Sequence, residues 1–487
     1  MPEMPDRIEL GEGLFISRLV CGLWQVADIE KDGTALDPER GADALQEYAQ
    51  AGFDTFDMAD HYGSAELITG RLLARHREGG RRPLAFTKWC PEPGPMTAEV
   101  VRKGVRERLD RLGVETVDLL QFHWWTFEHP AWLDALHEMK RLREEGLIRA
   151  IGVTNFDAAH LRVAIADGIP VLTNQVSFSL VDRRAAGDLS ALCRETGVKL
   201  LAYGTLCGGF LADRWLGAPE PASISDWSRS KYKRFIDTAG GWQAFQGILR
   251  AASEIAHKHG VSISNVATRW VLEHEAVAAT IIGARLGESE HREDNLKVFS
   301  FALDAEDRAR LDEAFVATKP IPGDCGDEYR RPPYLTASGD LSHHLDAIPP
   351  VYKAEPVPGR PDRWRVSSGS VWEPIAGYSR AVRVKDTIRV SGTTATHGGD
   401  RCVAPGDAGA QTTYILDKIA AAIAALGGSM EDVVRTRIYL RDASKWEPVS
   451  RAHGRMFGEI KPANTLVEVG NLIGDYEVEI EAEAVVS

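Results

Sequence analysis

The chain has 487 residues, of which 44% are hydrophobic and 26% charged, and its formal net charge is −14. This length exceeds one ordinary domain, and the composition is that of a globular protein. A nucleic-acid-binding protein would carry a basic surface, so the acidic balance argues against that class. The most apolar runs are too short to span a bilayer, and the N-terminal residues lack the pattern of a signal peptide. We therefore expect a cytoplasmic protein without nucleic-acid or membrane partners.

The six cysteines are scattered and form no CxxC pair. This spacing argues against both a disulfide framework and a zinc site. We expect a reduced protein with no bound metal.

Residues 18–300 alternate short apolar runs with amphipathic stretches, the pattern of repeated βα units. Eight such units over this length predict a (β/α)8 TIM barrel in residues 1–316. A doubly wound sheet also fits the alternation, but no glycine fingerprint follows the first strand and several strands end in polar residues. The expected strands are Arg18–Leu23, Phe53–Asp57, Leu84–Lys88, Val117–Phe122, Arg149–Val153, Val171–Gln175, Lys199–Tyr203 and Ala279–Ile282.

Two segments interrupt this regular pattern. The connection from Gly204 to Gly241 is unusually long and is interpreted either as a substrate lid or as a solvated insertion. Residues 317–365 are rich in proline and predict a semi-rigid linker. After it, residues 366–487 show strands and helices typical of a smaller α+β domain.

Ionisable residues lie at or just beyond the ends of three consecutive barrel strands. Asp57 ends the second expected strand and Tyr62 lies just beyond it. Lys88 ends the third strand and His123 follows the fourth. Since the carboxyl ends of barrel strands share one mouth, these side chains should meet there. A lysine cation makes a neighbouring tyrosine a better proton donor, and a histidine can orient a carbonyl by a hydrogen bond. These groups are the ones that reduction of a carbonyl needs.

The segments 56–63, 86–89, 119–123 and 151–156 together resemble the catalytic strands of the aldo-keto reductases, over about residues 7–316. The resemblance implies that Asp57, Tyr62, Lys88 and His123 form the catalytic tetrad, with Tyr62 as proton donor. It also implies a nicotinamide cofactor. Thr154, Asn155 and Gln175 match the positions that hold the carboxamide, Tyr203 matches the aromatic residue under the nicotinamide ring, and Gly204, Thr205 and Leu206 match the pyrophosphate segment.

The segment after the last expected strand resembles the family's adenosine-phosphate site. Arg285 suits bidentate phosphate binding, while Arg292 is interpreted either as a ligand of the 2′-phosphate or as a solvated residue. Gly283, Asp294 and Asn295 complete the match, and His291 stands where the family usually has a basic residue or Gln. We expect NADP as cofactor, with NAD also possible.

Tryptophans flank several strand ends. Trp24, Trp89 and Trp124, together with Trp125, are expected to wall an apolar substrate pocket. Cys207 lies close to the predicted mouth, but no base accompanies it, so a covalent role is not expected.

The segments 377–381, 390–392 and 478–482 resemble the Rid/YjgF family, whose fold is chorismate-mutase-like, over about residues 370–487. The resemblance implies a trimer with clefts between subunits. Tyr378 and Glu479 match cleft positions. Asn464 replaces the arginine that imine-hydrolysing members use to bind a carboxylate, and an amide lacks that ionic fork.

We therefore expect an NADP-preferring oxidoreductase of small carbonyl compounds, joined to a Rid-like domain that mainly assembles a homo-oligomer. Two alternatives stay open. One is a redox-sensing or binding protein with weak turnover, similar to the potassium-channel β-subunits. The other is a bifunctional enzyme in which an imine hydrolase supplies a carbonyl to the reductase.

Overall fold

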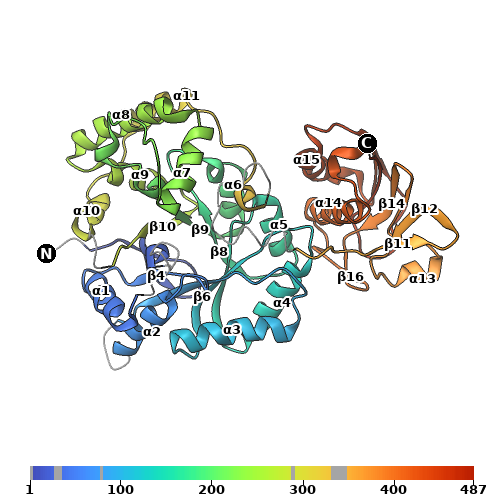
Figure 1. Ribbon diagram of the computed structural model, residues 1–487, viewed down its shortest axis with the longest axis horizontal. Helices are drawn as coiled ribbons and strands as arrows, with labels where there is room; N and C mark the ends of the chain where they lie inside the picture. Colours follow the sequence, from blue (N-terminus) through green and yellow to red (C-terminus); the bar gives the residue numbers. More distant parts are fainter. Residues whose placement is uncertain (1–3, 27–35, 77–80, 287–290, 331–347, 487) are drawn as a thin grey trace.

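The computed structural model describes residues 4–26, 36–76, 81–286, 291–330 and 348–486. Two folded units follow one another along the chain (Figure 1). The first is a closed barrel of eight parallel strands surrounded by helices, and the second is an α+β unit built on a seven-stranded sheet. The predicted fold class is confirmed.

The barrel strands pair in the order β10-β3-β4-β5-β6-β7-β8-β9, so the last strand closes against the first. All eight coincide with the strands expected from the sequence, to within a few residues. Their bounds are β3 (Leu19–Gly22), β4 (Thr55–Asp57), β5 (Leu84–Trp89), β6 (Val117–His123), β7 (Ile148–Thr154), β8 (Val171–Ser177), β9 (Lys199–Tyr203) and β10 (Val277–Gly283).

A hairpin of β1 (Arg7–Glu9) and β2 (Phe15–Ser17) covers the N-terminal end of the barrel. Leu14 and Ile16 are fully buried and pack with interior strand residues such as Phe86 and Leu119. Burying each such side chain contributes roughly 1.5–3 kcal/mol. The closed end leaves the carboxyl ends of the strands as the mouth.

Each helix of the outer ring presents an apolar stripe to the strands. In α3 (Ala98–Leu112), for example, Val101, Val105 and Leu109 recur every four residues and are buried. Thr97 caps its N-terminus, and Gly113 ends it in the left-handed conformation that glycine adopts at little cost. The other helices are α1 (Pro38–Gln50), α2 (Ala65–Arg75), α4 (Ala131–Glu144), α5 (Ala158–Ala166), α6 (Asp188–Thr196), α7 (Trp227–Thr238), α8 (Gly241–His259), α9 (Ile263–Leu272), α10 (Arg292–Leu296), α11 (Ala305–Val316) and α12 (Asp327–Arg330). None of the helices in the described part of the chain has the length and apolar character needed to cross a membrane.

The second unit has the strand order β11-β12-β13-β14-β19-β17-β18. Helices α14 (Ala408–Ala425) and α15 (Trp446–Phe457) pack on one face of this sheet, and α13 (Trp372–Ala376) precedes β13. Its strands are β11 (Ala354–Val357), β12 (Arg360–Val366), β13 (Ala381–Val384), β14 (Thr387–Thr394), β17 (Val433–Leu440), β18 (Ala463–Glu468) and β19 (Val478–Val485), with the small pair β15 (Thr396–His397) and β16 (Arg401–Cys402) beside them.

The structure differs from the predicted linker over residues 317–365. Residues 331–347 lie outside the described part of the chain, but α12 forms before them and β11 and most of β12 form after them. β12 is exposed along nearly its whole length, so its residues 360–365 lack the alternation of apolar and polar side chains that marks a strand. The second domain therefore extends further toward the N-terminus than residue 366.

The two units meet where α14 packs against α5, side by side in Figure 1. The His160 ring on α5 contacts carboxylates from both units, with Nδ1 2.6 Å from Asp157 and Nε2 3.0 Å from Asp417 on α14. Arg455 of the second unit lies 2.9 Å from Asp157 of the barrel. Buried charged groups thus join the domains.

Candidate active site

Asp57 and Lys88 form a buried ion pair at the centre of the barrel mouth. β4 and β5 are adjacent strands, and Lys88 Nζ lies 2.6 Å from Asp57 Oδ2. The same Nζ donates to the carbonyl of Met58 at 2.8 Å. Both side chains are almost fully buried, where each charge compensates the other's loss of water.

Two glutamines hold the other oxygen of Asp57. Gln121 of β6 and Gln175 of β8 each donate an amide hydrogen to Asp57 Oδ1, at 2.9 and 2.7 Å. Gln175 also donates to Gln121 Oε1 at 2.8 Å. The sequence analysis missed Gln121. A glutamine two residues before His123, and so on the same face of the strand, was the signal that could have found it.

Tyr62 lies on the turn after β4, beside the ion pair. Lys88 Nζ lies 5.0 Å from the centre of the Tyr62 ring, and the backbone N–H of Tyr62 donates to the Ala59 carbonyl at 3.1 Å. Trp24 packs edge-on against the Tyr62 ring, with centroids 5.0 Å apart. A cation so close stabilises the negative charge that develops when a phenol gives up its proton.

His123, at the end of β6, is buried next to the pair. Burial, reinforced by the charge of Arg330, holds the pKa of His123 well below its usual value, so the imidazole is neutral. Its Nε2 atom is buried and has no hydrogen-bond partner among the described residues. The rings of Trp125 and Tyr329 contact it edge-on, with centroid distances of 4.5 and 5.4 Å. A neutral imidazole with an unused nitrogen is suited to binding a polar atom of a ligand.

The predicted carboxamide-binding residues lie on the next strand ends. The Tyr203 hydroxyl donates to Asn155 Oδ1 at 2.9 Å, and the Asn155 backbone has a left-handed φ of 58°. Thr154 Oγ1 is buried without a partner among the described residues. The Gln175 amide nitrogen is directed at Asp57, as described above. The unused hydroxyl at the mouth fits a polar group such as a carboxamide.

The predicted pyrophosphate segment follows β9. Gly204 has φ +69°, and a Cβ there would lie 2.5 Å from the Tyr232 hydroxyl of α7, so only glycine fits. Leu206 is partly exposed, whereas Thr205 is buried. At β10, a Cβ on Gly283 would meet Gln25 at 2.5 Å. At both positions a side chain of the protein occupies the space that a Cβ would need.

Cys207 follows this segment and is fully buried. Burial raises the pKa of its thiol to about 12. A thiol that keeps its proton is a poor nucleophile.

The predicted adenosine-phosphate residues carry ion pairs on the rim. Arg285 binds Asp226 at 2.9 Å, and Arg292 binds Glu47 at 2.9 Å and lies over the Tyr48 ring. Asp294 accepts a hydrogen bond from Ser262 at 2.9 Å. Asn295 is partly buried in α10.

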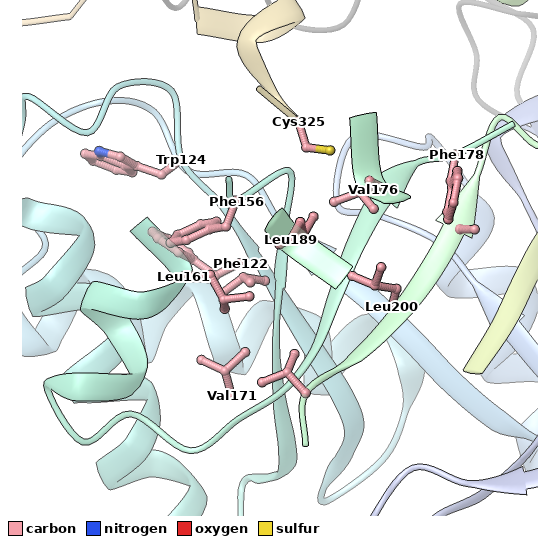
Figure 2. Close-up of a cluster of buried hydrophobic side chains, with 14 of the residues drawn as sticks. Phe122, Trp124, Phe156, Leu161, Val171, Val176, Phe178, Leu189, Leu200 and Cys325 are labelled. Atoms are coloured by element: carbon pink, nitrogen blue, oxygen red, sulfur yellow. The ribbon is translucent and has the colours of Figure 1, made fainter. Parts of the chain in front are cut away.

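The structure corrects the expectation for two of the tryptophans. Trp89 follows Lys88 directly, so it points out of the barrel and packs on Gly104 of α3. Trp124 is fully buried and stacks on Phe122 (Figure 2), with centroids 5.8 Å apart. Neither lines the mouth, whereas Trp24 contacts Tyr62 and Trp125 contacts His123.

α12 covers the mouth, a feature that the sequence did not reveal. The Tyr329 hydroxyl lies 3.2 Å from that of Tyr203 and accepts a hydrogen bond from Lys231 of α7. Arg330 donates to the carbonyls of Trp124, at 2.8 Å, and of Asn155, at 2.5 Å. Just before α12, Cys325 is directed into the buried cluster of Figure 2. α7, within the long connection expected as a lid or an insertion, also contacts this mouth through Lys231.

The predicted Rid-like cleft is divided in this structure. Tyr378 and Glu479 line the same cavity, and burial raises the pKa of Glu479 against the opposing charge of Arg380. Asn464 lies on β18, at the opposite edge of the sheet from β11, and donates to Thr436 Oγ1 at 2.9 Å. The chain alone does not bring Asn464 to the other two.

Comparisons with known proteins agree with both units. The model of the Aldo/keto reductase family matches residues 18–315, and that of Endoribonuclease L-PSP matches residues 369–486. Flagellar radial spoke protein 5 of Chlamydomonas reinhardtii is 34% identical over 33% of this chain and 34% of its own length. The chain thus spans about a third of that relative.

Two further relatives are covered more fully. The chloroplastic pyridoxal reductase of Arabidopsis thaliana is 27% identical over 54% of this chain and 73% of its own. The solved structure of the glycerol dehydrogenase AKR11B4 from Gluconobacter oxydans is 25% identical, with a TM-score of 0.53, over 66% of this chain and 98% of its own.

The closed barrel and the family match over residues 18–315 define an NAD(P)-dependent oxidoreductase of the carbonyl and alcohol class. The chain belongs to the aldo/keto reductase family and carries a second, YjgF-like domain.

Proposed function

We propose that this chain interconverts a small aldehyde or ketone and its alcohol, with Tyr62 as the proton donor and with NADP preferred over NAD. The position of the Lys88 cation between Asp57 and the Tyr62 ring carries the proposal. When bound, NAD(P)H would supply the hydride. Thr154, Asn155, Gln175 and Tyr203 would hold its nicotinamide end.

Each residue of the mouth has a task in this reaction. Lys88 stabilises the phenolate that Tyr62 becomes when its proton moves to the carbonyl oxygen. Asp57 holds Lys88 in place through the ion pair. Neutral His123 donates a hydrogen bond that orients the carbonyl, and the α12 segment excludes water from the mouth.

Replacing Tyr62 by Phe tests the assignment. General acid catalysis contributes about 10²–10⁴-fold, so turnover of an aldehyde should fall by that range while cofactor affinity, measured by fluorescence titration, stays unchanged. Tyr439→Phe removes a hydroxyl from the second domain and serves as the matched control. Parent-like turnover by Tyr62→Phe would show that another group supplies the proton.

The preference for NADP is supported by the two arginines that follow β10. A lost hydrogen bond to a charged group costs about 1.5–3 kcal/mol, so Arg285→Ala should weaken NADPH binding more than NADH binding. Arg308→Ala removes an arginine from a comparable ion pair with Glu273 and should change neither. Equal affinities of the parent protein for both cofactors would contradict the proposal.

We also propose that the second domain assembles the chain into a trimer rather than hydrolysing imines. α15 binds the Thr436 face of the sheet through His453. On the opposite face, Arg437 and Tyr439 are half-buried and Val467 is 42% exposed, which suits contact with further copies. Val467→Arg in the full chain should lower the mass measured by light scattering. A monomeric parent protein, or rapid release of ammonia from a 2-imino acid, would refute this proposal.

A further inference from the structure

A cavity of about 970 Å³ lies between the barrel and the second domain. The barrel contributes the start of α4 and the residues before it, including His129, Pro130 and Asp134. The second domain contributes α14, β14 and the loops around them. Two cationic side chains of the second domain, Lys418 and Arg380, line this cavity and play no part in the reaction proposed for the barrel.

Lys418 projects from α14 and is 8% exposed. Its Nζ donates to two backbone carbonyls, those of Thr394 at 3.2 Å and Thr396 at 2.6 Å. A neutral amine has two N–H groups and one lone pair, whereas an ammonium has three N–H groups. Two carbonyl acceptors therefore satisfy the neutral amine completely and leave its lone pair unused.

The surroundings of Lys418 favour that neutral form. Burial, followed by the positive charge of Arg380, lowers the pKa of Lys418 to about 7, and Glu373 only partly opposes them. The other carboxylates and imidazoles that line the cavity are those of Glu479, Asp134, His129 and His397. His397 lies 2.7 Å from Asp134. A desolvated lysine next to a second cation is the arrangement that makes an amine nucleophilic.

We propose that Lys418 is the nucleophile of a second site, which binds small carbonyl compounds bearing a carboxylate and forms a Schiff base with them. Arg380 is the carboxylate-binding group. Its guanidinium is fixed by hydrogen bonds to the Gly392 carbonyl at 2.7 Å and the Thr393 hydroxyl at 2.6 Å. Tyrosine rings enclose the rest of the ligand; they are Tyr352, Tyr378, Tyr414 and Tyr476.

The chemistry balances without any redox partner. The lone pair of Nζ attacks the carbonyl carbon, a C–N bond forms, and the π electrons move to oxygen, which takes up a proton. The nitrogen then loses its protons as the C–O bond breaks, so that one water leaves and a C=N bond remains. Hydrolysis reverses the step and returns the carbonyl compound.

This site is separate from the barrel mouth, and its test needs no nicotinamide cofactor, so its outcome is independent of the proposed oxidoreductase function. The full-length protein is incubated with pyruvate, reduced with borohydride, digested and mapped by mass spectrometry. We expect one reduced adduct per chain, on Lys418. Its rate of formation should rise through about pH 7, whereas exposed lysines deprotonate near ~10.4. Mapping the unaltered protein keeps the result independent of how variants fold.

Variants then separate the nucleophilic role of Lys418 from the carboxylate-binding role of Arg380. Lys418→Met should abolish the specific adduct, whereas Lys353→Met, at an exposed lysine of the same domain, should leave it intact. Arg380→Gln should slow labelling by pyruvate at least tenfold while changing labelling by acetone, which has no carboxylate, much less. Adducts spread over exposed lysines with Lys418 unmodified, binding of pyruvate without a trapped adduct, or unchanged labelling of Lys418→Met would each overturn the proposal.

Discussion

Asp57 uses its two carboxylate oxygens for different partners. Oδ2 binds Lys88, and Oδ1 accepts hydrogen bonds from Gln121 and Gln175. This division fixes the carboxylate in one orientation and holds the lysine in contact with the Tyr62 ring. The two glutamines therefore act as positioning residues for a charge that they do not touch.

Gln121→Met tests that role at nearly constant side-chain length. Losing a donor to a buried charged acceptor costs about 1.5–3 kcal/mol, so the free energy of unfolding should fall by that amount. Because Asp57 is then less firmly oriented, kcat should fall while KM for the carbonyl substrate changes little. Unchanged kcat in a destabilised variant would limit Gln121 to a structural role.

The neutral state of His123 predicts a pH dependence of stability. Its folded pKa is depressed below the unfolded value of about 6.5, so its neutral form stabilises the fold above that pH, and this contribution is lost as pH falls. His123→Gln removes the titration. The free energy of unfolding of the parent, relative to this variant, should therefore decrease between pH 8 and pH 5. A constant difference would mean that His123 titrates normally.

At the scale of elements, the mouth is covered by two segments that are distant in sequence. α7 belongs to the long connection after β9, which its length already marked as unusual. α12 consists of only four residues, too short for any periodic pattern. Its anchoring by Arg330 to two carbonyls and the Phe127 ring is a tertiary contact.

This contrast shows what the sequence could predict. The eight barrel strands are predicted from short apolar runs, and Asp57, Lys88 and His123 lie at or next to their C-terminal ends, so the convergence of these side chains follows from topology. The positions of Trp89 and Trp124 depend on which face of the chain turns inward at the last residue of a strand. β12 is exposed and charged, so its pairing rests on backbone hydrogen bonds that side-chain patterns do not report.

Arg330→Ala should release α12 from the mouth. Arg330 is partly buried, and its replacement removes the hydrogen bonds to the carbonyls of Trp124 and Asn155. KM for the carbonyl substrate should therefore rise, and α12 should exchange its amide hydrogens faster. Arg330→Lys serves as the matched control, because an ammonium keeps the charge without the planar fork and should recover only part of the effect. Wild-type exchange in Arg330→Ala would show that α12 is held by other contacts.

At the scale of the whole molecule, the domains are joined through titratable groups. Burial lowers the pKa of His160, but the carboxylates of Asp157 and Asp417 together raise it by more than burial lowers it. The pKa of His160 is therefore above its usual value. Burial raises the pKa of Asp157, but the positive charges of Arg455 and His160 lower it by more. The pKa of Asp157 therefore lies well below its usual range. The contribution of His160 to the free energy of unfolding is present below about pH 6.5 and is lost as the pH rises through the folded pKa of His160. That of Asp157 is present above about pH 3.9 and is lost as pH falls.

Docking of the domains should therefore be firmest between about pH 4 and 6.5. Removing one partner of a buried charged pair costs about 3–5 kcal/mol, so His160→Gln should lower the unfolding temperature most at pH 6 and less at pH 9, as measured by calorimetry. His137→Gln, which removes a half-exposed histidine paired with Asp167, is the control. An equal loss at both pH values would show that His160 acts through packing alone.

The packing of α14 between its own sheet and α5 has a consequence for synthesis on the ribosome. All eight barrel strands and α12 emerge before α14. The barrel can therefore close while the surface of α5 that later packs against α14 is still exposed. At about 5–20 residues per second, the roughly 80 residues between α12 and α14 take on the order of 4–15 s. During that interval Asp157 and His160 face water instead of Asp417 and Arg455. A nascent chain stalled just after α12 should therefore expose to chaperones the surface of α5 that is buried in the finished protein.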